Sequence, residues 1–328
     1  MLVRFKNEGC YNLVFRPIGT SRDVGATLEA PGSRFLMADC KTSSTSLSPP
    51  PADVLEAIAR GQVLFDQGPV ITKKIILHGK VAMVKYGRNV RHSEALAMNL
   101  VHVHAPTVRV PCVLAVYQTC ETDGFRITYI ISDWIDGCSL DNVWDTLSTH
   151  DKDDICEQLR HIIQILRQLR PPGQHYVGAV GNMPCTDPII FDQGPFKDIP
   201  SFNAALTDVA RPYFRWNLLS IVERSLARTN SYRIVFTHGD LHISNIMVRQ
   251  SMSPSDSDEH VTRSNRWMIV ALVDWECAGW YPEHWEYVKL LSSVKWRSDW
   301  AARAQTFLDK HYDEEFLLDN RLRMHLRI

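Results

Sequence analysis

The pattern of apolar and polar positions predicts a strand-rich first half of the chain. Two runs rich in β-branched residues are separated by His78-Gly79-Lys80, which is typical of a β-hairpin. Two further runs follow a short helix expected at residues 93–101, and another short helix, capped by Asp53, is expected at residues 54–59. The four strands are expected at residues 70–77, 81–86, 108–117 and 126–134.

The second half is predicted to be mostly helical. Its clearest helix covers residues 151–169, where apolar side chains recur at spacings of three and four until Pro171-Pro172-Gly173 ends the run. Asp153 and Asp154 lie in its first turns, where acidic residues are favourable. Further helices are expected at residues 139–147, 202–228 (broken near Pro212) and 285–326, and strands at 234–237, 246–249 and 267–273.

These elements predict an α+β chain with two lobes. A small β-rich N-lobe is expected at residues 53–134 and a larger, mostly helical C-lobe at residues 135–328. Residues 1–52 are interpreted as an extension that ends in a Ser- and Pro-rich linker. The polar stretch at residues 250–266 is interpreted as a mobile surface loop.

Composition narrows the class of protein. Lys and Arg (36) nearly balance Asp and Glu (37), so no global field favours nucleic acid or an anionic membrane as partner. No apolar run reaches the roughly 18 residues of a membrane helix, and the first residues carry charges instead of a secretory signal. The eight cysteines include no C-x-x-C pair, so we expect reduced thiols and a cytoplasmic protein.

One segment combines the groups that phosphoryl transfer needs. Asp240 and Asn245 lie five residues apart directly after an apolar strand, and Asp274 follows a later strand. One carboxylate can position or deprotonate an attacking hydroxyl, while an amide oxygen and a second carboxylate can hold magnesium against phosphates. The spacing from His238 to Asn245 is the H-x-D-x-x-x-x-N spacing of a kinase catalytic loop.

These motifs resemble a known family. Residues 238–248 and 272–282 are similar to the aminoglycoside phosphotransferase and choline kinase-like family, with its protein-kinase-like fold, and look most like its fungal members. The resemblance extends to Val84-Lys85-Tyr-Gly, Glu94-Ala, residues 131–137 and Gly194-Pro-Phe196.

The resemblance implies roles for individual residues. Asp240 would be the catalytic base, Asn245 and Asp274 would bind magnesium, and His238 would brace the loop. Lys85 would contact the α- and β-phosphates and pair with Glu94. Backbone groups near the following residues would meet the adenine: Ser132, Asp133 and Trp134.

The expected reaction uses ATP and Mg²⁺ to phosphorylate a hydroxyl of a small polar molecule that could carry an amine. Glu283 and Glu286 are candidates to receive that amine. A protein substrate is less favoured, because no Ala-Pro-Glu segment follows Asp274. Neither the acceptor nor the oligomeric state follows from the sequence.

Two other functions stay open. Residues 61–70, where a phosphate-covering loop is expected, contain no G-x-G-x-x-G, so a kinase-like nucleotide-binding scaffold without turnover is one alternative. The second is a metallohydrolase, because His238, Asp240 and His242 would share one face of an extended strand and could bind a transition metal.

Several neighbouring residues have structural interpretations. Trp275 and Trp280 are expected in the core, and Asp133 and Asp136 in solvent. Glu276 could approach a metal or serve a structural role.

Overall fold

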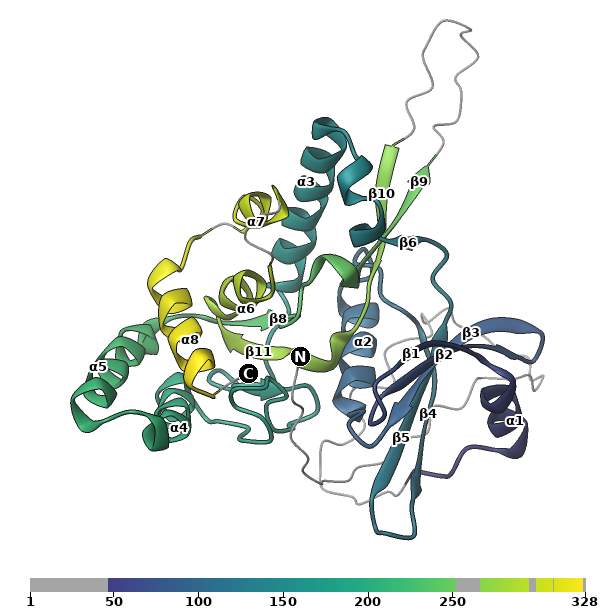
Figure 1. Cartoon of the computed structure of the whole chain (residues 1–328), viewed down its shortest axis with the longest axis horizontal. Coiled ribbons are helices and arrows are strands. Elements are labelled where there is room, and N and C mark those ends of the chain that lie inside the picture. The colour runs from purple at the N-terminus through teal and green to yellow at the C-terminus, as the bar shows by residue number, and fades with distance from the viewer. Residues whose placement is uncertain (1–46, 252–265, 295–298, 309, 327–328) are drawn as a thin grey trace, which may run out of the picture. The chain divides into compact units, whose positions relative to one another are not determined.

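The computed structural model describes residues 47–251, 266–294, 299–308 and 310–326 (Figure 1). The expectations for residues 1–46 and for most of the polar stretch at 250–266 lie outside these residues. The described residues form two compact units. The N-terminal unit contains residues 47–103 and 112–134. The C-terminal unit contains residues 104–111 and the described residues from 135 onward.

The strands are arranged in three sheets. They are β1 (Gln62–Asp66), β2 (Ile71–Leu77), β3 (Lys80–Gly87), β4 (Val113–Cys120), β5 (Arg126–Asp133), β6 (Cys138–Ser139), β7 (Gly178–Ala179), β8 (Ile234–Thr237), β9 (Ile246–Ser251), β10 (Arg266–Leu272) and β11 (Gly279–Pro282). The first five form one sheet in the order β1-β2-β3-β5-β4, and the others form the small sheets β10-β9-β6 and β7-β11-β8.

The helices lie mostly in the second unit. The α-helices are α1 (Ala52–Arg60), α2 (His92–His104), α3 (Thr149–Leu166), α4 (Ile199–Ala210), α5 (Trp216–Ala227), α6 (Trp285–Ser293), α7 (Asp299–Ala304) and α8 (Asp313–Leu326). Short 3-10 turns are η1 (Leu140–Asn142), η2 (Trp144–Thr146), η3 (Arg211–Tyr213), η4 (Arg228–Ser231), η5 (Ile243–Asn245) and η6 (Trp275–Cys277).

The five-stranded antiparallel sheet is the core of the N-terminal unit. The expected hairpin is confirmed: β2 pairs with β3, and His78 and Gly79 turn between them with φ of 51° and 76°. Helix α1 packs Val54 and Ile58 against one face of this sheet. It begins after Pro51, so Asp53 lies in its first turn and the predicted Asp53 cap is wrong.

Two boundaries of the first sheet differ from the sequence expectation. Strand β4 begins at Val113 instead of residue 108, because the preceding segment contains Pro106 and Pro111, which lack the N–H of a strand ladder. In that segment the carbonyl of Arg109 accepts a hydrogen bond from Leu272 N (3.0 Å). Strand β1 was not expected, because its sequence (Gln-Val-Leu-Phe-Asp) shows no alternation of apolar and polar residues. In the structure all five residues are exposed.

The C-terminal unit is mainly helical, as expected. A core cluster unites α4, α5, α6 and α8, and Phe202, Tyr281 and Trp285 form edge-to-face and stacked pairs within it. The break near Pro212 is confirmed by η3 between α4 and α5. The helix expected at residues 139–147 is wrong: Cys138 and Ser139 pair with β9, and two 3-10 turns follow.

A buried ion cluster fixes α6 against α8 and a nearby loop. Lys289 Nζ lies 3.1 Å from Asp187 Oδ2 and 2.9 Å from Asp319 Oδ1, and Arg323 Nε lies 2.8 Å from Asp319 Oδ2. Only 3% of the Lys289 side chain is exposed, so removing one partner would leave a buried charge uncompensated. Within the described residues no helix has the length and apolarity needed to cross a membrane.

The start of α3 gives a test of local stability. Ser148 Oγ accepts from Asp151 N (3.1 Å), and Asp151 Oδ2 accepts from Ser148 N (3.3 Å), which is a capping box. We expect Ser148→Ala to lower the free energy of unfolding in urea by about 0.5–2 kcal/mol. The exposed neighbour Thr149→Ala should change it by about 0.5 kcal/mol or less. Equal effects of the two substitutions would contradict the capping role.

Candidate active site

The turn after β8 has a backbone that only glycine fits. Gly239 has a φ of 80°, and a Cβ built there would lie 2.5 Å from the carbonyl oxygen of Cys277. The turn then closes on itself, since His242 N donates to Asp240 O (2.7 Å) and Asn245 N donates to His242 O (2.8 Å). This compact turn, followed by η5 and β9, fixes where Asp240 and Asn245 lie.

The side chains of Asp240 and Asn245 contact each other. Asn245 Nδ2 donates to the backbone oxygen of Asp240 (2.8 Å) and to its Oδ2 (3.2 Å). Because both partners are acceptors, they identify the nitrogen of the amide, and Asn245 Oδ1 is the atom left to serve as an oxygen ligand. The pair that was inferred from spacing is therefore brought together by the loop.

Asp274 joins this pair from the end of β10. Val273 N donates to Asn245 O (2.9 Å), which holds the two segments side by side. Asp274 adopts a left-handed backbone conformation with a φ of 64°. One of its carboxylate oxygens lies within 4.8 Å of a carboxylate oxygen of Glu276. Burial, followed by the charges of Asp274 and Glu276, raises the pKa of Asp240 to about 7, although the hydrogen bond from Asn245 lowers it.

Glu286 is the functional residue that the sequence analysis misassigned. Its Oε2 accepts from His238 N (2.6 Å) and its Oε1 from Gly239 N (3.2 Å), so both oxygens hold the turn after β8. Burial raises the pKa of Glu286 to about 7, and the two backbone N–H groups oppose that rise. The expectation that Glu286 receives an acceptor amine is wrong.

A sequence signal for this role exists in α6. Residues 285–291 (Trp-Glu-Tyr-Val-Lys-Leu-Leu) are apolar apart from two charged residues, which is typical of a helix buried on all sides, and all seven are buried in the structure. Charged residues in such a helix need internal partners. Glu286 and Lys289 are those residues. The other amine candidate, Glu283, is also wrong: it is 5% exposed, and its Oε2 lies 2.7 Å from Arg233 Nη2.

His238 braces the turn, as the resemblance implies. Its Nδ1 accepts from Asp240 N (3.3 Å), so the ring carries its proton on Nε2 and donates to Val273 O (3.1 Å). His242 Nδ1 contacts Ser244 Oγ at 2.8 Å. The transition-metal interpretation is wrong, because these residues form a turn instead of a strand face and both nitrogens of His238 are engaged.

In the N-terminal unit, Lys85 and Glu94 form an ion pair. Lys85 Nζ lies 3.0 Å from Glu94 Oε1 and 2.9 Å from its Oε2. Lys85 lies within β3, between β2 and β5, and strand alternation turns it to the face opposite Val84, which packs against α1. Glu94 lies in the first turn of α2.

Of the three residues expected near the adenine, Ser132 and Asp133 end strand β5 and Trp134 follows it. Asp133 exchanges hydrogen bonds with Cys112: its N donates to Cys112 O (3.0 Å), and its Oδ1 accepts from Cys112 N (2.6 Å). Burial raises the pKa of Asp133, so the expectation of a solvated carboxylate is wrong for it. Ser132 Oγ donates to the Asp133 carbonyl (3.4 Å), and the Trp134 ring lies 4.3 Å from Lys74 Nζ.

The remaining expectations concern isolated residues. Asp136 is 83% exposed and pairs with Arg249, as expected of a solvated side chain. Trp275 and Trp280 are buried in the core, also as expected. The segment where the phosphate-covering loop was expected consists of β1 and a turn through Gly68, whose φ is 73°.

The pH dependence of stability tests the environment of Glu286. Because its folded-state pKa is raised above the usual 4.5, the folded chain keeps a proton that the unfolded chain releases as pH rises from about 4.5 to 7. The free energy of unfolding should therefore fall across this window. In urea titrations at about pH 5 and about pH 8, Glu286→Gln should reduce that fall by about 1–3 kcal/mol. The exposed Glu314→Gln is the control, and an unchanged fall in Glu286→Gln would contradict the assignment.

Comparisons with known proteins identify the family and the fold of the chain. A family profile described as "Phosphotransferase enzyme family" matches residues 88–326. A comparison with curated proteins gives no match. The chain is similar to a thermostable mutant of aminoglycoside phosphotransferase APH(4)-Ia in its apo form, with a TM-score of 0.50 and 14% identity over 83% of this chain and 86% of that one. It is also similar to such a mutant in a ternary complex with ADP and hygromycin B, with a TM-score of 0.51 and 13% identity over 84% and 87%.

At these identities the likeness concerns the fold, and it confirms the expected kinase-like α+β architecture. The family match covers well over half of the chain and includes the turn after β8, the end of β10 and helix α6. The chain therefore belongs to the phosphotransferase enzyme family.

Proposed function

We propose that this chain transfers the γ-phosphoryl group of ATP to a hydroxyl of a small polar molecule. The observation that carries the proposal is the contact of Asp240 with Asn245, beside Asp274, in a chain of this family. A bond forms between the hydroxyl oxygen and the γ-phosphorus, the bond to the bridging oxygen breaks, and ADP leaves. The hydroxyl proton passes to Asp240, which acts as the base.

The residues around Asp240 fit a magnesium ion. Asn245 Oδ1 and the carboxylate of Asp274 are hard oxygen donors, and Glu276 adds a second carboxylate within 4.8 Å of Asp274. The charges of Asp274 and Glu276, which add to burial in raising the pKa of Asp240, also favour a bound cation. Magnesium held there would supply the positive charge that phosphate groups need, and this chain's residues would hold the ion and orient the acceptor.

Lys85 and Glu94 support the nucleotide half of the proposal. The carboxylate of Glu94 contacts the ammonium with both oxygens and so orients Lys85. In this orientation Lys85 would bind the α- and β-phosphates, while backbone groups at Ser132–Trp134 would meet the adenine. The APH(4)-Ia complex contains ADP and hygromycin B, which supports a nucleotide donor and a small-molecule acceptor here.

The competing function is a nucleotide-binding scaffold without turnover. No G-x-G-x-x-G precedes Lys85, which favours this alternative. The intact Asp240–Asn245 contact favours catalysis, because a scaffold has no need for a carboxylate held in a desolvated, acidic environment. A scaffold would show a melting temperature raised by ATP and magnesium but no product with any acceptor.

The catalytic and metal-binding roles separate in two substitutions. With a panel of small amino alcohols and sugars, we expect Asp240→Asn to lower kcat by about 10²–10⁴-fold while nucleotide affinity stays unchanged. Asp274→Asn should instead weaken magnesium-dependent nucleotide binding by about tenfold or more. Asp136→Asn, which removes an 83% exposed carboxylate, is the control. Normal transfer by Asp240→Asn would refute the assignment of the base.

A third substitution tests the nucleotide half separately. Lys85→Ala should raise the KM for ATP by about tenfold or more, since a charge-assisted contact to phosphate is lost. Lys80→Ala removes an exposed lysine at the start of the same strand and should leave the KM unchanged. Initial rates at varied ATP measure both, and an unchanged KM in Lys85→Ala would contradict the phosphate contact.

A further inference from the structure

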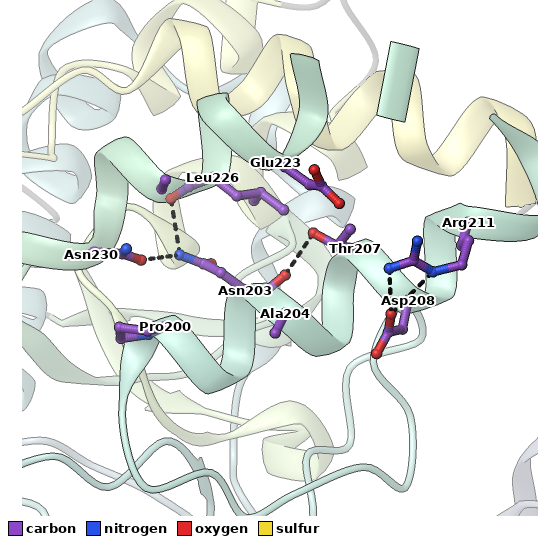
Figure 2. A pocket seen from close by; sticks show the side chains of 10 residues that line it. Pro200, Asn203, Ala204, Thr207, Asp208, Arg211, Glu223, Leu226 and Asn230 are labelled. Carbon is purple, nitrogen blue, oxygen red and sulfur yellow. Dashed lines mark hydrogen bonds and ion pairs between the residues drawn. The ribbon is translucent and has the colours of Figure 1, made fainter. Parts of the chain in front are cut away.

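The groove between α4 and α5 in the C-terminal unit is a junction between helices (Figure 2). Asn203 Nδ2 donates to Leu226 O and to Asn230 Oδ1, both at 2.9 Å, and so joins α4 to α5 and to the turn that follows α5. At the rim, Arg211 Nη2 pairs with Asp208 Oδ1 (3.0 Å). These contacts serve helix packing. A contact that bears on nucleotide binding lies instead in the N-terminal unit.

The turn between β1 and β2 lies at the same end of the sheet as Lys85. Thr72 on β2 is the cross-strand partner of both Phe65 on β1 and Lys85 on β3, so these three side chains share one face of the sheet. Residues 67–70 connect Asp66, the last residue of β1, to the start of β2. This turn is therefore close in register to the ammonium group that is proposed to bind the α- and β-phosphates.

Three consecutive positions of this turn have no backbone N–H group to offer a phosphate. Gln67 N donates to Val70 O (3.1 Å). Gly68 N donates to Asp66 Oδ1 (2.8 Å), and Pro69 has no N–H. Glycine-rich phosphate loops act through such groups. The contribution of this turn to a nucleotide site therefore depends on where the turn is held.

The segment after β3 holds the turn in place. Gly87 has a φ of 147°, and a Cβ built there would overlap the carbonyl oxygen of Pro69. Asn89 N donates to the same oxygen (3.2 Å), and Val70, the next residue of the turn, is 2% exposed. Only glycine permits this close approach, so Pro69 packs directly against residues 87–89.

Arg88 connects this support to the opposite edge of the sheet. Its guanidinium pairs with Asp123 Oδ2 (2.7 Å) and with Glu121, and its Cζ lies 4.4 Å from the centre of the Phe125 ring. These three partners lie between β4 and β5, and β4 is the edge strand opposite β1. The turn after β1 is thus anchored, through residues 87–89, to the far side of the same sheet.

We propose that Gly87 is a positioning residue for the nucleotide. It lets Pro69 pack against the segment after β3, and this packing fixes the β1–β2 turn beside Lys85, with Arg88 as the anchor. The inference rests on the proposed function, because it assigns the turn to the nucleotide half of that site. A short turn held from outside takes the place of a glycine-rich loop.

Isothermal titration calorimetry of the full chain with ATP and magnesium tests this role. We expect Gly87→Ala to raise the Kd and the KM for ATP by about tenfold or more, because the new Cβ displaces Pro69. The KM for the acceptor should stay unchanged. A merely destabilising change would instead lower the folded fraction and leave both KM values as they are.

Gly79→Ala is the matched control for this substitution. It also replaces a glycine at positive φ, in the hairpin turn at the other end of β3, but its Cβ would meet no atom within 4 Å. Gly79→Ala should therefore leave the affinity for ATP unchanged. An equal loss of affinity in Gly79→Ala and Gly87→Ala would overturn the inference.

A second pair of variants decides the question if Gly87→Ala does not fold. Arg88→Ala removes partly exposed contacts and should raise the Kd for ATP by about two- to fivefold. Arg60→Ala breaks an exposed ion pair on α1 and should leave the Kd unchanged.

The outcomes separate this inference from the proposed function. A wild-type chain that does not bind ATP would overturn both. If the wild type binds ATP, an unchanged Kd in folded Gly87→Ala would overturn the inference alone. Where Gly87→Ala does not fold, an unchanged Kd in Arg88→Ala would do the same.

Discussion

The turn after β8, which contains Asp240, depends on one buried carboxylate. The N–H groups of His238 and Gly239 follow the end of β8, and buried N–H groups rarely stay unpaired. Glu286 accepts both, and α6 in turn is held by the contacts of Lys289 with Asp187 and Asp319. The position of Asp240 therefore rests on a helix far away in sequence, and rigid support of this kind is what preorganised catalysis requires.

The sequence predicted those elements whose own pattern determines them. The hairpin of β2 and β3, the helix α3 and the break between α4 and α5 each carry a local signal of period, cap or proline. No such local signal marks β7, β11 or the turns at residues 140–146. β7 has two residues, and β11 (Gly-Trp-Tyr-Pro) exists because it pairs with both β7 and β8. Such elements are set by tertiary pairing, which no local window contains.

The candidate site shows the same difference between residues with a local sequence signal and residues whose partners lie far away in the chain. Asp240, Asn245 and Asp274 were identified because chain spacing and flanking strands place them together, and Lys85 and Glu94 because of their order. Glu283 and Glu286 were misassigned because the partner of an acidic residue is not local. Arg233, which pairs with Glu283, is fifty residues earlier in the chain, and the N–H groups held by Glu286 are forty-seven and forty-eight residues earlier. The apolar run around Glu286 and Lys289, in residues 285–291, could have indicated an internal role.

The distribution of acidic residues also constrains how an acceptor is recognised. In the C-terminal unit the buried carboxylates of Glu286, Glu283 and Asp319 are committed to backbone N–H groups, Arg233 and Lys289. Asp240, Asp274 and Glu276 are instead grouped, and burial, followed by the charges of Asp274 and Glu276, raises the pKa of Asp240 at a cost in stability. A cation at that group would relieve the cost. Under the proposed function these grouped carboxylates serve the metal and the phosphoryl donor, so we infer that the acceptor is held mainly by neutral hydrogen bonds around its hydroxyl groups.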